Sequence, residues 1–236
     1  MYELDLAQAE LRVAALWSGC SLMLRHIDEG ADVHGETAKS LFGVEPGDEQ
    51  WGFLRQVAKR ANFSLIFGSG AKTFRAMIAK ETGTLMPMGK AKQLVYDWND
   101  LYPEYGRAIN TYMRQAETLG YTELVNGRRR WYAPGEDRHK AFNQRVQGSL
   151  AEYGKDWIIS TKRLMDENEI DARFRREFPG CGGAGLIMVI HDSQVLLLPD
   201  SAADGLTERV IANSETIWSE MFAGVPGGAE VHAWDS

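Results

Sequence analysis

The sequence predicts an α+β protein in which helices fill the middle of the chain and strands lie near both ends. Helical periodicity dominates residues 51–119 and 138–167, whereas β-prone runs beside turn residues occur near the two termini. A chain of 236 residues with 44% apolar content can bury a full core. We therefore expect one large domain or two small ones.

The predicted helices share apolar positions three or four residues apart and recognisable stop signals. Glycine favours the left-handed end of a helix and proline cannot continue one, so Gly43 and Pro103 mark an end and a break. The predicted helices are the later part of 3–17, then 34–42, 51–67, 72–82, 89–119 broken at Pro103, 138–167 interrupted at Gly148 and Gly154, and 203–222.

Strands are predicted where β-prone residues flank turn residues. Residues 3–17 start with a short alternating piece. In "YTELVNGRRRWYA" (121–133) the dipeptide Asn126-Gly127 favours a hairpin turn. In "GLIMVIHDSQVLLLP" (185–199) two apolar strands meet at the polar tip His191-Asp192-Ser193.

Composition excludes several classes of protein. No apolar run approaches the ~20 residues that a membrane-spanning helix needs. The N-terminus "MYELDLAQAE" is acidic, unlike a secretory signal, so we expect a cytoplasmic protein. Cys20 and Cys181 form neither a disulfide framework nor a metal quartet, and we expect buried or incidental thiols.

Charge is distributed unevenly along the chain. Residues 1–50 hold 3 Lys/Arg against 10 Asp/Glu, residues 51–147 hold 16 against 8, and residues 148–236 hold 7 against 15. A basic middle is typical of phosphate contact, and acidic flanks could hold divalent cations. A solvated helical face is the alternative explanation.

One helical face combines cations and aromatic rings. In "RQVAKRANFSLIFG" (55–68), Arg55, Lys59, Phe63 and Phe67 recur every four residues and therefore share one side of a helix. Such a stripe could bind a ligand that is both charged and flat. A surface cation pair beside a core aromatic stripe would give the same pattern.

Two aspartates interrupt the apolar strands at opposite ends of the chain. Asp5 lies in the first strand, and Asp192 lies at the tip of the C-terminal hairpin. Carboxylates from neighbouring strands, with no basic residue beside either, would form an oxygen-ligand site for Mg²⁺. An ordinary turn aspartate is the alternative reading of Asp192.

Six stretches occur in a characteristic order. They are "DLAQAELRVAA" (5–15), "DVHGETA" (32–38), "RQVAKRANFSLIFG" (55–68), "GRRRWY" (127–132), "AFNQRVQGSLAE" (141–152) and "VIHDS" (189–193). Together they resemble the signature motifs of family A DNA polymerases, the bacterial DNA polymerase I family, which are written DYSQIELR, DIHTxTA, RRxxKxxNFGxxYG, GRRR, AFNxPVQGTAAD and VHDE.

The resemblance implies a right-hand polymerase architecture, with helical fingers inserted in an incomplete antiparallel palm sheet. Residues 1–33 and 138–236 would form the palm, and residues 34–137 the fingers, and we expect the thumb and exonuclease domains to be absent from this chain. The implied function is a template-directed DNA polymerase subunit that adds deoxynucleotides to a primer 3′-end by two-metal-ion nucleotidyl transfer. Its implied partners are primer–template DNA and dNTPs.

The resemblance also assigns roles to individual residues. Asp5 and Asp192, with the backbone carbonyl of Leu6, would hold two Mg²⁺ ions, and Lys59 would act on the triphosphate. Glu10 would be a steric gate against ribonucleotides. The implied nucleotide-binding residues are Gln8, Glu10, His34, Arg55, Phe63 and Phe67, and the implied DNA-binding residues are Arg128, Arg129, Asn143, Gln147 and His191, with Arg130 beside them.

The chain departs from the family pattern in several places. Ser193 replaces the Glu that follows the second aspartate, which removes a carboxylate near the metals. Phe67 replaces Tyr. The chain starts four residues before Asp5, so we expect a second polypeptide carrying the thumb and upstream palm, as in a split, phage-encoded polymerase. The alternative is a non-catalytic nucleotide- or DNA-binding remnant.

Overall fold

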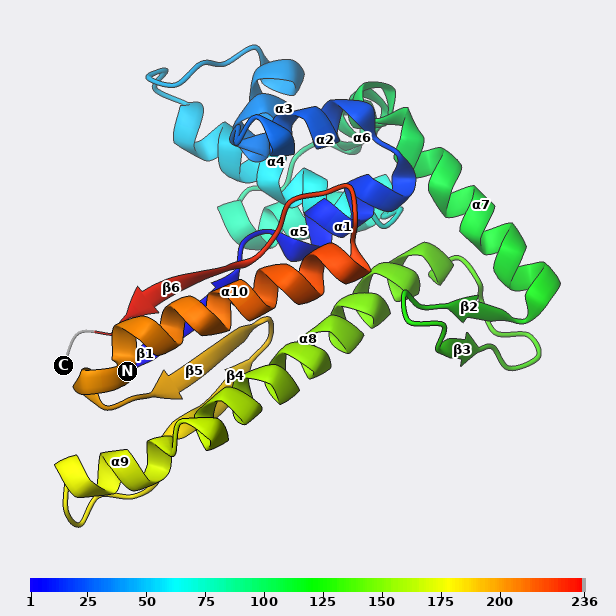
Figure 1. The fold of residues 1–236 in the computed structure, drawn as a ribbon. Helices are drawn as coiled ribbons and strands as arrows, with labels where there is room; N and C mark the ends of the chain where they lie inside the picture. The colour runs from blue at the N-terminus through cyan, green and yellow to red at the C-terminus, as the bar shows by residue number, and fades with distance from the viewer. Residues whose placement is uncertain (235–236) are drawn as a thin grey trace. The chain divides into compact units, whose positions relative to one another are not determined.

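The structure is a computed structural model. It describes residues 1–234, with the exception of the side chains of Glu81 and Thr82. It combines helices with small antiparallel sheets, so the predicted α+β class is confirmed. The chain divides into two compact units, Met1–Ala9 with Gly148–Ser236, and Glu10–Gln147 (Figure 1). The last two residues of the predicted palm segment 138–236 lie outside the described part of the chain.

The first unit is built on a four-stranded antiparallel sheet. Its strands are β1 (Tyr2–Leu6), β4 (Gly185–Ile190), β5 (Ser193–Leu197) and β6 (Ala229–Ala233), in the order β4-β5-β1-β6. The N-terminal strand β1 therefore lies between two strands from the C-terminal end of the chain, pairing Glu3 with Val195 of β5 and with His232 of β6.

Two helices cover one face of this sheet. The part of α8 (Ala141–Glu167) that belongs to this unit and α10 (Ala203–Met221) lie across the strands (Figure 1). Tyr153 and Trp218 pack edge to face at 5.4 Å, and the hydroxyl of Tyr153 lies 2.9 Å from Oγ of Ser214. The short helix α9 (Ile170–Glu177) and a 3-10 turn, η1 (Asp200–Ala202), complete the unit.

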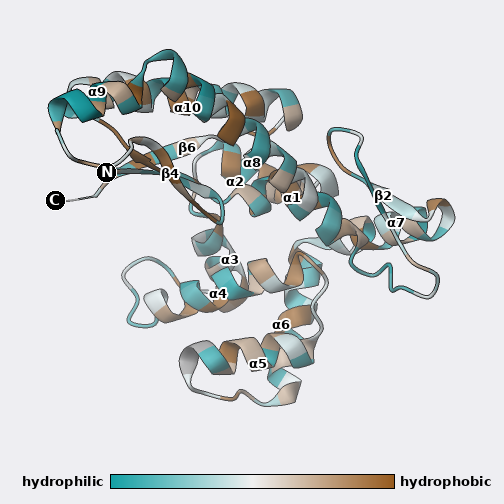
Figure 2. Ribbon diagram, turned by 90° about the horizontal axis from the view of Figure 1, so that it is seen from below, coloured by the Kyte–Doolittle hydropathy of each residue, from teal (hydrophilic) through white to brown (hydrophobic). Residues whose placement is uncertain are grey.

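Edge strand β4 exposes its apolar side chains. Residues 187–190, Ile-Met-Val-Ile, are 38% to 50% exposed, and much of β4 is brown in Figure 2. An unpaired, apolar strand edge readily pairs with another chain.

No helix among residues 1–234 is long and apolar enough to cross a membrane.

The second unit is mainly helical. Its helices are α1 (Ala9–Ser18), α2 (Ser21–Asp28), α3 (Val33–Phe42), α4 (Trp51–Leu65), α5 (Ala71–Thr82), α6 (Met88–Leu101), α7 (Pro103–Leu119) and the first turns of α8. Gly43 ends α3 in the left-handed conformation at φ 66°, and Pro103 separates α6 from α7 as the first residue of α7. Both sequence signals are confirmed.

Aromatic rings fill the core of the helical unit. Trp98, Tyr102 and Tyr105 are fully buried, and the centroids of the Trp98 and Tyr102 rings lie 5.2 Å apart. The hydroxyl of Tyr102 lies 2.8 Å from Oγ1 of Thr37, which ties α3 to the start of α7. The buried hydroxyls of Thr37 and Tyr102 therefore satisfy each other, as is usual for buried polar groups.

The predicted hairpin at residues 121–133 is present. Strands β2 (Tyr121–Glu123) and β3 (Arg129–Trp131) pair antiparallel. Gly127 adopts φ 82° in the connecting loop, where its amide donates to the carbonyl of Leu124. Asn126-Gly127 therefore marks the turn as expected.

Other predictions were wrong at element boundaries. Helix α4 ends at Leu65, which leaves Phe67 in the following turn. Helix α8 starts at Ala141 and runs unbroken through Gly148 and Gly154. Each interior glycine costs about 1 kcal/mol, but burial of Phe142, Tyr153 and Trp157 on the same helix outweighs that cost.

Four elements of the described chain had no counterpart in the sequence prediction: α2, α9, η1 and β6. The thiol expectation is met for Cys20, which is a buried free cysteine whose pKa burial raises to about 11. Cys181 is an exposed free cysteine.

Candidate functional site

The sheet unit brings the two predicted metal-binding aspartates to neighbouring strands. Asp5 lies on β1, and Asp192 lies in the two-residue turn between β4 and β5. Leu4 pairs with Gln194, so Asp5, one residue further along β1, comes beside the position of Ser193. The residue that follows Asp192 is therefore the lateral neighbour of Asp5.

The electrostatics of Asp5 reflect this crowding. Burial raises the pKa of the Asp5 carboxyl, and the charges of Asp192 and Glu3 raise it further. His232 and a hydrogen bond from the backbone of Leu6 act in the opposite direction without cancelling the rise. Carboxylates that raise one another's pKa are stabilised by a nearby cation.

The donors of this pair fit a hard divalent cation. Carboxylate and carbonyl oxygens are the ligands that Mg²⁺ prefers, and it keeps several waters when only one or two carboxylates bind it. Residues 1–234 contain no group of three or more His, Cys, Asp or Glu side chains placed to hold a metal. The site therefore consists of Asp5 and Asp192, with the Leu6 carbonyl as the third predicted ligand.

Backbone strain occurs beside both aspartates. Gln8, in the turn after β1, has φ 55°, and His191, directly before Asp192, also has φ 55°. Non-glycine residues rarely adopt this left-handed region, and such strain is concentrated at functional sites. Glu169, before α9, is the other such residue in the described chain. Gln8 and His191 thus stand out independently of their sequence motifs.

The helical unit contains the cation–aromatic stripe. Arg55, Lys59 and Phe63 lie on α4 at successive turns. Phe67 lies beyond the helix end, and its ring centroid is 6.4 Å from that of Phe142 on α8. The structure therefore brings three of the four stripe residues onto one helix and leaves Phe67 packed against another.

Arg55 is already paired. Its guanidinium contacts both carboxylate oxygens of Asp32, with Nε–Oδ2 at 2.5 Å and Nη2–Oδ1 at 2.9 Å. Burial alone would raise the pKa of Asp32, but the Arg55 hydrogen bonds and other contacts outweigh it and lower that pKa. Lys59 forms no ion pair with any described residue, so its charge is available for an anion.

His34 is held by a buried amide. The side chain is 2% exposed, its ring centroid lies 5.6 Å from that of Phe63, and its Nδ1 lies 3.1 Å from Nδ2 of Asn62. Trp98 donates from Nε1 to Oδ1 of Asn62 at 2.8 Å. Because an indole N–H can only donate, Oδ1 must be the acceptor there, and Nδ2 of Asn62 must be the donor toward His34.

The protonation of His34 follows from this network. Burial lowers the pKa of His34 to about 4, and the nearby Lys59 and Arg55 charges also lower it. The ring is therefore neutral at pH 7, with Nδ1 as the acceptor and Nε2 carrying the proton. Nε2 is buried without a partner among the described residues. His34 thus holds a spare donor beside Phe63 on the stripe.

Asn62 was not predicted as a site residue. It is fully buried on α4 among Ala58, Ala61 and Leu65. The sequence does contain a signal for Asn62: an amide occupies a position where the helical pattern predicts an apolar side chain.

Glu10, the predicted steric gate, and Gln147, a predicted DNA-binding residue, are in contact within the helical unit. Gln147, on α8, donates from Nε2 to Oε1 of Glu10, on α1, at 3.0 Å. Asn143, one turn earlier on α8, has an Oδ1 without a described partner. Between them, Arg145 lies over the Trp17 ring at 4.6 Å, a contact that the sequence did not predict.

The predicted basic cluster lies on the β2–β3 hairpin. Arg128 and Arg129 are exposed. Arg129 pairs with Glu123 at 3.1 Å and lies over the Tyr121 ring at 4.4 Å, while Trp131 is 63% exposed. Exposed cations beside an exposed aromatic ring are typical of nucleic-acid contact. Arg130 instead pairs with Glu136.

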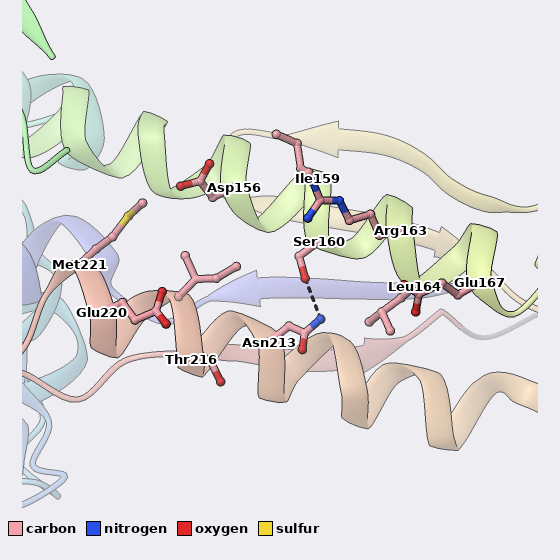
Figure 3. Close-up of a pocket in the computed structure, with 11 residues that line it drawn as sticks. Asp156, Ile159, Ser160, Arg163, Leu164, Glu167, Asn213, Thr216, Glu220 and Met221 are labelled. Carbon is pink, nitrogen blue, oxygen red and sulfur yellow. Dashed lines mark hydrogen bonds between the residues drawn. The ribbon is translucent and has the colours of Figure 1, made fainter. Parts of the chain in front are cut away.

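One groove of the sheet unit contains none of the site residues that the sequence predicted. It lies between α8 and α10, where Nδ2 of Asn213 donates to Oγ of Ser160 at 2.6 Å (Figure 3). Acidic, basic and apolar side chains all line it, which indicates no single ligand chemistry. They are Asp156, Ile159, Ser160, Arg163, Leu164, Glu167, Asn213, Thr216, Ile217, Glu220 and Met221.

Comparison with protein families gives one decisive match. The family model described as "DNA polymerase family A" covers residues 1–231. The chain belongs to this family. The resemblance found in the motifs of this family A chain is therefore confirmed over nearly its whole length.

Individual relatives of this family A chain are similar at a moderate level. "DNA polymerase I, thermostable" of Thermus aquaticus is 29% identical over 212 residues, which is 86% of this chain and 23% of that protein. DNA polymerase I of Deinococcus radiodurans is 27% identical over 222 residues, 89% of this chain and 21% of that protein. The chain thus spans about a quarter of the length of the curated relatives it matches.

A solved structure has a similar fold. The POL domain of Pol1 from M. smegmatis, in a complex with DNA primer-template and dNTP, matches with a TM-score of 0.78 and 21% identity. The match covers 98% of this chain and 38% of that one. At this identity the comparison supports the polymerase-domain fold alone.

Proposed function

We propose that this chain carries the nucleotidyl-transfer centre of a template-directed DNA polymerase. The sheet-bearing unit is the palm and the helical unit belongs to the fingers. The sequence-based boundaries at residues 33 and 137 lie inside the helical unit. The observation that carries the proposal is that Asp5 lies on β1 and Asp192 in the turn that leads into the neighbouring strand β5, in a chain that matches the family over residues 1–231.

In this reaction the primer 3′-oxygen bonds to the α-phosphorus of a deoxynucleotide. The bond from that phosphorus to the β-phosphate oxygen breaks, pyrophosphate leaves, and the hydroxyl proton is released. Asp5, Asp192 and the Leu6 carbonyl would hold two Mg²⁺ ions. When bound, the ions supply a lowered pKa at the 3′-hydroxyl and neutralise charge on the leaving group.

The α4 stripe binds the nucleotide. Lys59 and the Nε2–H of His34 donate to the triphosphate, and the Phe63 ring stacks beside the base and sugar. Arg55 shares its guanidinium between Asp32 and a phosphate, because a guanidinium has five N–H donors and Asp32 accepts two of them. Phe67 would sit near the templating position, and Gln8 near the nucleotide.

Sugar selection is the role of Glu10. A carboxylate at this position crowds a ribose 2′-oxygen, and its hydrogen bond from Gln147 fixes where it lies. Asn143 and Gln147, on α8, contact the primer–template junction. His191, in the sheet unit, contacts DNA. Arg128 and Arg129 neutralise backbone phosphates.

The test is primer extension on a primed template with Mg²⁺ and all four deoxynucleotides. The wild-type chain is compared with Asp192→Ala and with Asp200→Ala, which removes an exposed aspartate outside the site, each with and without a thumb-bearing fragment of a family member. Extension by wild type and Asp200→Ala, lost in Asp192→Ala, supports the proposal. A need for the fragment would support the expected second polypeptide, which stays a prediction.

A second function is favoured by Ser193, which replaces the family Glu. A chain that lost this carboxylate could bind nucleotide or DNA without catalysis. Nucleotide binding by the folded chain, with no extension in any of the six reactions, would support this remnant and overturn the polymerase proposal.

A further inference from the structure

Glu3 lies on the same face of β1 as Asp5. Side chains two residues apart on a strand point to the same side, and both carboxylates are half-buried. Across the sheet, Glu3 pairs with Val195 of β5 and His232 of β6.

Two donors fix the Glu3 carboxylate. Oγ of Ser193 lies 3.0 Å from Oε1, and Nε1 of Trp234 donates to Oε2 at 2.9 Å. Ser193 is 3% exposed, so its hydroxyl has few alternatives, one being the carbonyl of Ile190 at 3.0 Å. The Glu3 carboxylate is therefore held at the residue that directly follows Asp192.

We propose that Glu3 is a positioning residue of the metal site, supplying from β1 the carboxylate that Ser193 lacks. This inference rests on the proposed function. Carboxylates that orient metal ligands without touching the metal typically change metal affinity or activity about 10- to 100-fold when removed. Glu3 acts through its hydrogen bond with Ser193, the residue that follows Asp192.

Comparison of sequence motifs does not identify Glu3, because its hydrogen-bond partners are distant in the sequence. Glu3 and Ser193 are 190 positions apart, and Glu3 and Trp234 are 231 apart. A charged residue in an alternating strand reads as an ordinary solvent-facing position. The antiparallel pairing of β1 with β5 brings it to Ser193.

Manganese binding to the full chain, followed by electron paramagnetic resonance, tests the proposal without requiring catalysis. The variants are Glu3→Gln, Glu3→Ala and the double variant Glu3→Ala/Ser193→Glu. Glu208→Ala, which removes an exposed carboxylate on α10, is the control for net charge. Asp192→Ala defines binding without the site.

We expect Glu3→Gln and Glu3→Ala to weaken Mn²⁺ binding about 10-fold, with Glu208→Ala unchanged. The double variant should recover most of the lost Mn²⁺ affinity, because it returns a carboxylate to the position directly after Asp192. In primer extension, the Mg²⁺ concentration for half-maximal incorporation should rise in the Glu3 variants and fall back in the double variant.

Two results distinguish a failure of the Glu3 proposal from a failure of the proposed polymerase function. If Glu3→Gln binds Mn²⁺ like wild type while Asp192→Ala does not, Glu3 is only a structural residue and this inference is wrong. If wild type binds no better than Asp192→Ala, the proposed function fails and the inference falls with it. Glu3→Gln keeps the size of the side chain and an oxygen that can accept from Ser193, so it remains informative if Glu3→Ala does not fold.

Discussion

Asn62 on α4 donates a hydrogen bond to Nδ1 of His34 on α3, with 3.1 Å between the nitrogens. The amide cannot be reversed, because Trp98 Nε1 donates to the Asn62 oxygen at 2.8 Å. This contact places the His34 proton on Nε2, the buried nitrogen without a described partner. His34 is thus a neutral donor beside the proposed triphosphate site.

Asn62→Asp should reverse the His34 tautomer. A carboxylate at position 62 accepts from both Trp98 and Nδ1, so Nε2 becomes an acceptor and repels phosphate. Losing one hydrogen bond to a charged group costs about 1.5–3 kcal/mol, so the Kd for a deoxynucleotide triphosphate should rise about 10-fold or more. Nitrogen NMR of the His34 ring and nucleotide titration measure the two effects.

The control Asn99→Asp changes an exposed amide on α6. An equal loss of nucleotide affinity in both variants would contradict the prediction.

Stability should fall in acid through His34. Its pKa is lowered from 6.5 to about 4 in the folded chain, so the unfolded chain binds the proton first as pH falls. The free energy of unfolding therefore has its full value above pH 6.5 and declines between pH 6.5 and 4. From pH 7.5 to 4.5 this group accounts for a loss on the order of 2.5 kcal/mol.

Urea unfolding of wild type and His34→Gln across this range isolates the effect. Asp32 precedes α3, and Arg55 and Lys59 lie on α4; these charges face His34 in both proteins. Their contributions therefore largely cancel in the difference. Parallel pH profiles for the two proteins would show that His34 is not buried as described.

Glu10→Ala should relax sugar selection. Removing the carboxylate opens space at the ribose 2′-oxygen and also removes the acceptor of the Gln147 hydrogen bond. We expect ribonucleotide incorporation to rise at least about 10-fold relative to deoxynucleotide incorporation, since a lost steric clash of about 1.4 kcal/mol gives that ratio. The measurement is single-nucleotide extension with each substrate. Asp28→Ala, at the exposed end of α2, should leave the ratio unchanged.

Gly227→Ala should destabilise the sheet unit. A Cβ at this position would lie 2.2 Å from Cε2 of Trp218, whose indole is buried and donates to the carbonyl of Val225. Overpacking of this kind costs about 1–3 kcal/mol.

Gly205→Ala is the matched change. Its Cβ would meet nothing within 4 Å on the exposed side of α10, so helix propensity should stabilise by about 0.5–1 kcal/mol. Thermal unfolding of the two variants should shift in opposite directions. A neutral Gly227→Ala would mean that Trp218 can move without cost.

The sequence by itself determined the family, the hairpin carrying Asp192 and the spacing of Arg55, Lys59 and Phe63. These features depend on contiguous residues, whose periodicity and turn chemistry are readable locally. It also gave most helix ends, because Gly43 and Pro103 act within one turn of the chain.

Only the tertiary structure decided the contacts between distant residues. It placed β6 beside β1, kept α8 continuous through two glycines, and joined Asn62 to His34 and Glu3 to Ser193. The physical reason is that a buried hydrogen bond or aromatic contact between segments 28 to 231 positions apart leaves no periodic pattern in either segment. Burial of large side chains supplies more free energy than local propensity, and so overrides it at these positions.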